Sequence, residues 1–84
     1  MPEFYSTIEE YQYGCPYWGH ISLEMDARYK PNPWAFKSGY RPDPNKNEFV
    51  VVFRNFDNTE QLVISCVPTP DGLQIDYRQK PIGS

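Results

Sequence analysis

The residue pair best suited to catalysis is Cys15 with His20, five positions further along the chain. A thiol becomes a nucleophile when a nearby base or positive charge helps it to lose its proton. The residues around Cys15 are acidic, which raises the pKa of a thiol, and His20 is the only histidine in the sequence. We therefore expect Cys15 to pack as a small apolar residue, His20 to begin a strand, and the protein not to be an enzyme.

Metal binding and acid–base chemistry find equally little support in the residue types. A structural zinc site needs four Cys or His ligands, and the chain has two Cys and one His. Two neighbouring carboxylates, Glu24 and Asp26, would lie on a wet strand face, where they would not be poised near neutral pH. Glu9 and Glu10 add further carboxylates, but the spacing of the four matches no metal-binding loop. The sequence therefore predicts no metal and no cofactor.

Charge is unevenly distributed along the chain. Residues 1–27 carry five acidic residues and no Lys or Arg, whereas the remaining residues carry eight basic and six acidic ones. An acidic segment repels a phosphate backbone and suits a basic protein surface. A protein partner with a basic surface is therefore expected ahead of nucleic acid, although an ordinary solvated acidic face would give the same pattern.

Two aromatic clusters are candidate contact surfaces. The first is the Tyr-rich segment 11–19, which adjoins Glu9 and Glu10, and the second is the group around Lys37. Tyr, Trp and Arg dominate protein-binding hot spots, and aromatic platforms with basic residues also bind single-stranded nucleic acid. The alternative is that the rings form the small core. The predicted binding residues are Glu9, Glu10, Tyr11, Tyr13, Tyr17, Trp18, Trp34, Phe36, Tyr40 and Arg41.

The elements that must position these residues are predicted from hydrophobic periodicity. Alternating apolar and polar residues predict strands over His20–Tyr29, Gln61–Val67 and Leu73–Arg78. Glu48–Phe53 is apolar on both faces, which predicts a strand in the middle of a sheet. Turn residues at 55–59 join Glu48–Phe53 to Gln61–Val67, and turn residues at 69–72 join the latter to Leu73–Arg78. An antiparallel meander of three strands is therefore expected.

Two segments allow no such simple prediction. Residues 4–13 fit a short helix, because Ser6 and Glu9 have the spacing of a capping box, but a strand over Thr7–Tyr13 fits as well. Residues 31–47 contain four prolines and predict a long ordered loop, which Trp34, Phe36 and Tyr40 would hold against the body.

The whole chain of 84 residues is short enough to form one domain, residues 1–84. We expect a mostly β fold, either a single antiparallel curved sheet or a small open barrel, with one short N-terminal helix as an option. No apolar run approaches the roughly 20 residues of a membrane span, and no signal peptide is visible. We therefore expect a cytoplasmic protein with Cys15 and Cys66 reduced; export by another route would permit one disulfide.

One run of residues resembles a known family. Ser38-Gly39-Tyr40-Arg41-Pro42 is similar to a signature of the C-terminal β-barrel of elongation factor Tu, and Asp71–Gln79, which includes Gly72-Leu73, is similar to the closing strand of that barrel. The similarity spans residues 20–84, but the Gly-Gly-Arg loop of the family is replaced by Pro31-Asn32-Pro33, and the middle is shorter. The resemblance implies a barrel that contacts protein or RNA without catalysis, with Tyr40 and Arg41 anchoring a turn.

These observations favour a non-enzymatic protein-binding module. Small, acidic, aromatic-rich domains suit inhibitors or immunity-type proteins of phage or bacterial origin, and this is the leading expectation. The alternative is a domain similar to the elongation factor Tu barrel that binds RNA or a ribonucleoprotein through Trp34, Lys37, Tyr40 and Arg41. Assembly with further copies of the chain stays open, and a membrane partner is not expected.

Overall fold

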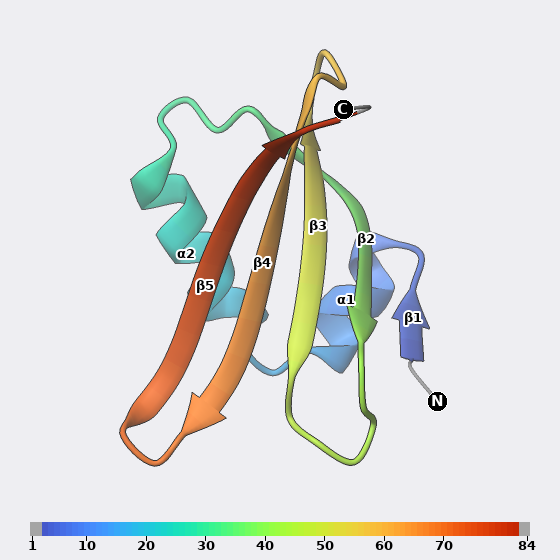
Figure 1. The fold of residues 1–84 in the computed structure, drawn as a ribbon, viewed down its shortest axis with the longest axis vertical. Helices are drawn as coiled ribbons and strands as arrows, with labels where there is room; N and C mark the ends of the chain where they lie inside the picture. The colour runs from blue at the N-terminus through green and yellow to red at the C-terminus, as the bar shows by residue number, and fades with distance from the viewer. Residues whose placement is uncertain (1–2, 83–84) are drawn as a thin grey trace.

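The fold consists of a five-stranded sheet and two helices. A computed structural model describes residues 3–82 of the chain (Figure 1). The elements in chain order are β1 (Glu3–Tyr5), α1 (Ile8–Gly14), α2 (Trp18–Arg28), β2 (Trp34–Arg41), β3 (Phe49–Asn55), β4 (Glu60–Thr69) and β5 (Gly72–Pro81).

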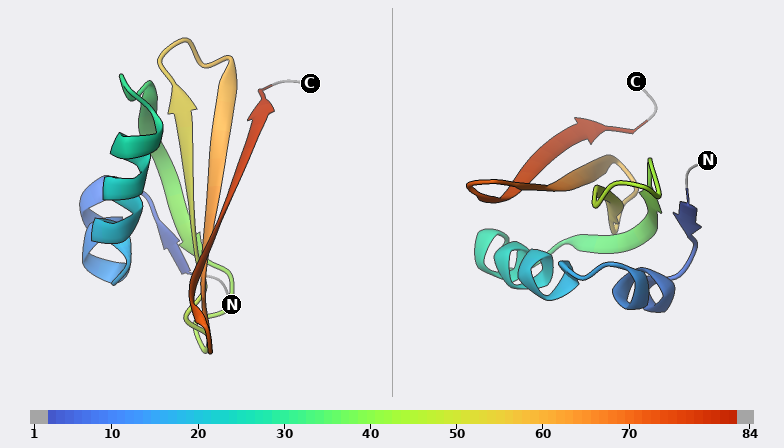
Figure 2. Two further views of the ribbon diagram at one scale, coloured as in Figure 1. Left: turned by 90° about the vertical axis from the view of Figure 1, so that its left-hand side faces the viewer. Right: turned by 90° about the horizontal axis from the view of Figure 1, so that it is seen from below.

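The strands follow one another across the sheet in the order β1-β2-β3-β4-β5, and every neighbouring pair is antiparallel. Both helices cover the same face, so the opposite face has no covering layer of described residues (Figure 2). The sheet is open, with β1 and β5 at its edges. The expectation of a mostly β fold with an antiparallel sheet and a short N-terminal helix is confirmed. Neither helix is long and apolar enough to cross a membrane.

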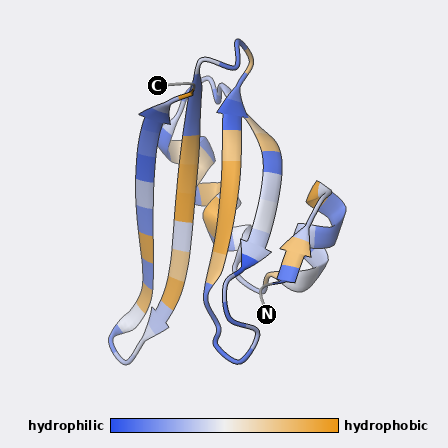
Figure 3. Cartoon of the chain, turned by 45° about the vertical axis from the view of Figure 1, so that its right-hand side comes forward, coloured by the Kyte–Doolittle hydropathy of each residue, from blue (hydrophilic) through white to orange (hydrophobic). Residues whose placement is uncertain are grey.

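The predicted meander is present as β3, β4 and β5. The turn before β4 places Asn58 at a φ of 57°, and the turn before β5 places Gly72 at a φ of 131°, a conformation that favours Asn and Gly. β3 is the middle strand, as its two apolar faces predict. Hydrophobic residues therefore run along most of its length (Figure 3).

The prediction of a strand over His20–Tyr29 is wrong, because this segment lies in helix α2. Ile21 and Met25 are buried, whereas Leu23, which belongs to the same apolar set in the alternating pattern, is 74% exposed. Spacings of four residues place Ile21 and Met25 on one side of a helix, and the partly buried Trp18 extends that side by one turn. The alternating pattern and the helical pattern share these residues, and tertiary packing selected the helical one.

The prediction of a loop over residues 31–47 is also wrong in its middle part, because β2 occupies Trp34–Arg41. Its pairing with β3 shifts between Phe36 and Ser38, so Lys37 sits in a bulge. A bulge places an extra residue in the strand and breaks the two-residue alternation by which strands are recognised. The prolines at 33 and 42 flank the strand instead of excluding it.

Helix α1 begins one residue later than the Ser6 cap predicts. Thr7 is the N-cap, and its Oγ1 accepts a hydrogen bond of 3.2 Å from the backbone N–H of Glu10. The spacing of Thr7 and Glu10 is that of a capping box, shifted by one position from Ser6 and Glu9. Ser6 instead donates its hydroxyl to Glu10 Oε1 over 3.4 Å. The short helix is confirmed, and the alternative strand over Thr7–Tyr13 is excluded.

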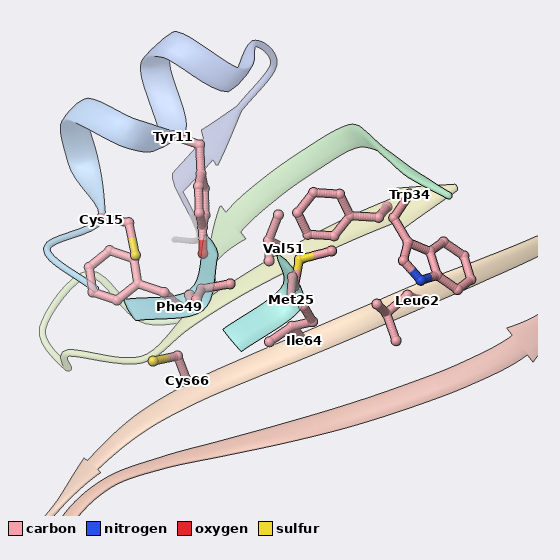
Figure 4. Packing of buried hydrophobic residues seen from close by; sticks show 11 residues of the cluster. Tyr11, Cys15, Met25, Trp34, Phe49, Val51, Leu62, Ile64 and Cys66 are labelled. Carbon is pink, nitrogen blue, oxygen red and sulfur yellow. The ribbon is translucent and has the colours of Figure 1, made fainter. Parts of the chain in front are cut away.

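The core lies between the helices and the inner faces of β3 and β4. Tyr11 points from α1 towards the sheet, and Met25 of α2 faces Ile64 and Leu62 (Figure 4). These side chains belong to one hydrophobic cluster, whose members are Tyr11, Cys15, Ile21, Met25, Trp34, Phe49, Val51, Phe53, Leu62, Ile64 and Cys66.

Gly39 of β2 provides the surface on which Tyr11 rests. A Cβ atom added to Gly39 would overlap with Cδ2 of the Tyr11 ring, and Gly39 itself is buried. The ring also makes contacts with Tyr5, Trp18 and Phe36 at centroid distances of 5.7, 5.7 and 5.9 Å. The missing side chain at position 39 therefore allows α1 to lie close against the sheet.

We predict that Gly39→Ala lowers the free energy of unfolding by about 1–3 kcal/mol, because the new methyl group must displace the Tyr11 ring. The measurement is urea unfolding followed by circular dichroism. Gly19→Ala is the matched control, since a Cβ there meets nothing within 4 Å and Ala favours the helix over Gly. Equal stability of the two variants would contradict the role given to Gly39.

Candidate functional site

Most of the aromatic residues that the sequence nominates for binding serve the core. Tyr11 has no exposed surface and Trp34 is 8% exposed. Tyr17, Trp18 and Phe36 are partly buried and pack against the same cluster. The rings therefore supply the packing area that a small chain needs, and their inner faces are not available to a partner.

The residues of the same prediction that remain at the surface lie on α1. Glu9, Glu10 and Tyr13 are exposed, and Tyr13 is 96% exposed. Strand β1 lies beside this helix and adds Phe4, which is 73% exposed. An open hollow of about 440 Å³ lies at the surface between β1 and α1. Its lining defines what we call the N-terminal patch, namely Glu3, Phe4, Tyr5, Glu10, Tyr13 and Gly14.

Local contacts fix the shape of the N-terminal patch. The Tyr5 hydroxyl donates a hydrogen bond of 3.3 Å to Glu3 Oε2. A Cβ on Gly14 would lie 2.7 Å from Cε1 of Tyr5, so the end of α1 must carry a glycine for the ring to lie there. Phe4 lies over Tyr40 of β2 with ring centroids 6.0 Å apart. The backbone pairing of β1 with β2 holds Phe4 in this place.

The electrostatics of the patch favour a cationic ligand. Burial, together with the Glu3 carboxylate, raises the pKa of Tyr5, so its hydroxyl stays protonated at neutral pH and can donate. Within residues 3–82, none of Glu3, Glu9 and Glu10 forms an ion pair. Unpaired carboxylates beside exposed aromatic rings attract Lys and Arg side chains, whose stems pack on rings while their charged ends reach the carboxylates.

The remaining predicted site residues, Tyr40 and Arg41, lie at the end of β2. Arg41 donates from Nε to the Lys46 carbonyl over 3.0 Å and from a terminal nitrogen to Asn47 Oδ1 over 3.3 Å. Its guanidinium carbon also lies 5.0 Å from the centroid of the Phe49 ring. Arg41 therefore holds the connection between β2 and β3, and two of its five N–H donors are used within the chain.

Two other hollows are present in the described part of the chain. One, of about 290 Å³, lies beside the core between the helices and β2, and Asp26 and Asn32 are the hydrogen-bonded polar pair on its wall. The other, of about 460 Å³, lies where β2 meets the turn after β3 and includes Lys37, Arg54 and Phe56. Neither is lined by two glutamates together with two largely exposed rings, as the N-terminal patch is.

The nucleophile candidate is placed in the core. Cys15 is 3% exposed and burial raises the pKa of its thiol, so the thiolate is disfavoured. His20 lies on the exposed side of α2 and pairs with Glu24, with Nε2 and Oε2 2.9 Å apart. Both Cys15 and Cys66 are free. Among residues 3–82, no group of three or more His, Cys, Asp or Glu side chains is placed to hold a metal ion.

Sequence reasoning missed Glu3, Phe4 and Tyr5 as site residues. β1 is only three residues long, so it shows no periodicity, and its pairing partner Gly39–Arg41 lies more than thirty positions away. The one available signal is the presence of two aromatic residues beside an acidic one next to the Glu9-Glu10 pair. That signal becomes specific only after the sheet brings β1 and α1 together.

Comparison of the chain with protein families, with curated proteins and with solved structures found no match.

Alkaline pH provides a test of the core placement of the thiols. Burial raises the pKa of Cys66 from 9.0 to about 11, so between these values the unfolded chain releases a proton that the folded chain retains. We predict that the free energy of unfolding falls as the pH rises through this window and is insensitive to Cys66 below it. The measurement is denaturant unfolding at several pH values.

Cys66→Ala is the matched control for this titration. Without this thiol, the decline of stability between these pH values should become shallower, because only Cys15 and the buried tyrosines still contribute. An identical decline in the variant would show that Cys66 does not titrate as its burial requires.

Proposed function

We propose that this protein is a non-enzymatic protein-binding module that recognises a basic segment of its partner through the N-terminal patch. The observation that carries the proposal is the pairing of Tyr13, 96% exposed, and Phe4, 73% exposed, with two carboxylates in one hollow. Exposed large rings beside unpaired acids form a surface that is better satisfied by a partner than by water.

The chemistry of the patch specifies what the partner supplies. A Lys or Arg side chain can lay its stem on Tyr13 and direct its charge to Glu3 or Glu10. The low entropy cost of fixing Tyr and Phe rings makes such contacts efficient. Glu9, exposed on the same helix, adds to the negative field that accelerates the approach of a basic surface.

A role as a small inhibitor or immunity-type protein of phage or bacterial origin agrees with this surface. Such a protein acts by covering a surface of its target, which needs a rigid contact patch and no catalytic machinery. The buried thiol of Cys15 and the exposed ion pair of His20 are consistent with a protein that performs no catalysis. The two free cysteines suit a reducing compartment, and we propose a cytoplasmic location.

The second candidate function is the binding of RNA or a ribonucleoprotein by a domain similar to the elongation factor Tu barrel. Of the residues that the sequence predicts for it, Trp34 is buried and Arg41 makes two hydrogen bonds within the chain. The observation in its favour is a different one, the hollow that combines Lys37 and Arg54 with Phe56, which is 75% exposed. This function predicts RNA binding that weakens steeply with added salt, and the absence of retained RNA at low salt would exclude it.

The test of the leading proposal reverses the charge of the patch. Glu9→Lys with Glu10→Lys should lower the association rate constant for the partner by about ten-fold or more, because electrostatic attraction chiefly governs encounter. Asp57→Lys with Glu60→Lys changes the net charge equally, in the turn between β3 and β4 and at the first residue of β4, away from the patch (Figure 1). The partner is first captured from cell lysate with the unaltered protein, and rates are then measured by surface plasmon resonance.

A second pair of variants separates charge from contact. Tyr13→Ala should raise the dissociation rate, because the ring forms part of the contact, whereas Phe56→Ala should leave it unchanged. The proposal fails if the captured partner binds the patch variants as it binds the unaltered protein, or if both charge variants slow its association equally.

A further inference from the structure

Strand β5 ends the sheet with a long and uncovered edge. It spans ten residues, Gly72–Pro81, and pairs with β4 without any shift of register from Thr69↔Gly72 to Glu60↔Pro81. From Gly72 to Lys80, no described strand pairs with its other side. Helix α2 lies over a face of the sheet and not beyond this edge (Figure 2), with the Arg28 guanidinium carbon 4.1 Å from the Tyr77 ring centroid.

The hairpin geometry decides which backbone groups this edge presents. Thr69 and Gly72 flank a two-residue turn and therefore form a hydrogen-bonded pair. Hydrogen-bonded and non-hydrogen-bonded pairs then alternate, so the even-numbered residues of β5 bond to β4. The N–H and C=O groups that point away from the sheet belong to Leu73, Ile75, Tyr77 and Gln79.

Between Gly72 and Lys80 the edge lacks three of the devices that prevent strands from pairing with other chains, namely proline, bulges and inward-pointing charges, although it carries charged side chains on its outer face. Long edge strands are usually interrupted by proline, a bulge or an inward-pointing charge. From Gly72 to Lys80 β5 has no proline, its ladder with β4 has no bulge, and its inward residues Leu73, Ile75 and Tyr77 are uncharged. Its charged residues, Asp76, Arg78 and Lys80, all point to the face opposite the helices.

Those charges make the edge complementary to itself in one register. When two copies of β5 pair antiparallel, each residue opposes one residue of the other copy. The helices of both copies lie on the same face of the joined sheet only if the two opposed residue numbers are both even or both odd, because side chains alternate between faces. The two longest such pairings are centred on Asp76 and on Tyr77. The first sets Asp76 against Asp76, which is repulsive, whereas the second sets Asp76 against Arg78 twice.

The register centred on Tyr77 also pairs the outward backbone groups of Ile75, Tyr77 and Gln79, and only at its ends does Leu73 meet a residue without an N–H group, Pro81. Tyr77 would oppose Tyr77 of the second copy, and Ile75 would oppose Gln79, with the outward N–H and C=O groups of each pair bonding to one another. Asp76 and Arg78 would then occupy non-hydrogen-bonded positions, where opposed side chains lie closest. The same register therefore places both the hydrogen bonds and the charges favourably.

We propose that the protein forms a two-fold symmetric dimer through antiparallel pairing of β5 with β5 of a second copy, centred on Tyr77. The two sheets join into one continuous sheet with all helices on one face. The occupant of the edge is a second copy of this chain because the strand's own charge order fits itself. This inference is independent of the proposed function, since the N-terminal patch lies at the opposite edge of the sheet.

The test uses sedimentation equilibrium of the full chain from about 5 µM to about 500 µM, where a dimer of moderate affinity changes its population. The unaltered protein should sediment as a monomer–dimer mixture. Asp76→Arg alone and Arg78→Asp alone should each weaken the dimer by at least about ten-fold, because each sets like charges opposite one another at two positions. Circular dichroism checks that both variants, which change exposed side chains, stay folded.

Mixing the two variants provides the decisive result. In the mixed pair, one strand carries arginine at both positions and the other strand carries aspartate at both, so opposite charges face one another at each contact. An equimolar mixture should therefore dimerise at least about ten-fold more tightly than either variant alone.

A monomeric unaltered protein across the whole range would overturn the proposal. So would a dimer that both single variants leave intact, because its interface would lie elsewhere. A dimer that the single variants abolish but the mixture fails to restore would exclude the register centred on Tyr77.

Discussion

The contact between the Tyr11 ring and Gly39 is the constraint on which the rest of the structure depends. One ring joins four elements, because it lies on β2 at Gly39 and touches Tyr5 of β1 and Trp18 of α2. Its hydroxyl is buried without a strong hydrogen-bond partner among the described residues and has the weakly polar Cys15 thiol as a neighbour, so packing compensates for most of the lost hydration. Burial also raises the pKa of Tyr11 far above its usual value, which keeps the hydroxyl neutral in the core. Since Tyr11 fixes α1 against the sheet, it also fixes the position of Tyr13 and Glu10 relative to β1.

The aromatic residues divide into buried and exposed ones. This division explains why the exposed rings of so small a chain point to a binding surface. A short chain buries a modest fraction of its surface, so it must use large rings to fill its core. Tyr11, Trp18 and Trp34 are used in this way. The rings that stay outside are therefore those that packing did not require, and Phe4 and Tyr13 lie together beside carboxylates. Phe56 and Leu23 are also exposed, but neither lies in a hollow lined by acidic side chains.

Sequence reasoning succeeded where local pattern and tertiary structure agree. The strands β3 to β5 alternate and are joined by short turns with Asn58 and Gly72 at positive φ, so the meander was predictable from neighbouring residues alone. It failed for α2, because Ile21 and Met25 satisfy both the alternating and the helical pattern, and only burial against the sheet decides between them. It failed for β2 because the bulge at Lys37 interrupts the alternation. The site was half predicted: Glu10 and Tyr13 were nominated, whereas Phe4 enters through a pairing of strands far apart in the sequence.

The two edges of the sheet have opposite characters, and this asymmetry links the two proposals. The edge at β1 is short and lies beside α1, so it offers side chains and little free backbone. The edge at β5 is long and uninterrupted, so it offers backbone in a register set by Asp76 and Arg78. Joining two copies at β5 would leave both N-terminal patches free at the outer ends of the combined sheet. A partner with two basic segments at a matching distance would then bind both patches, and the second contact would form at a high effective concentration. A monomer would bind each segment separately, so dimerisation through β5 would strengthen binding without altering any residue of the patch.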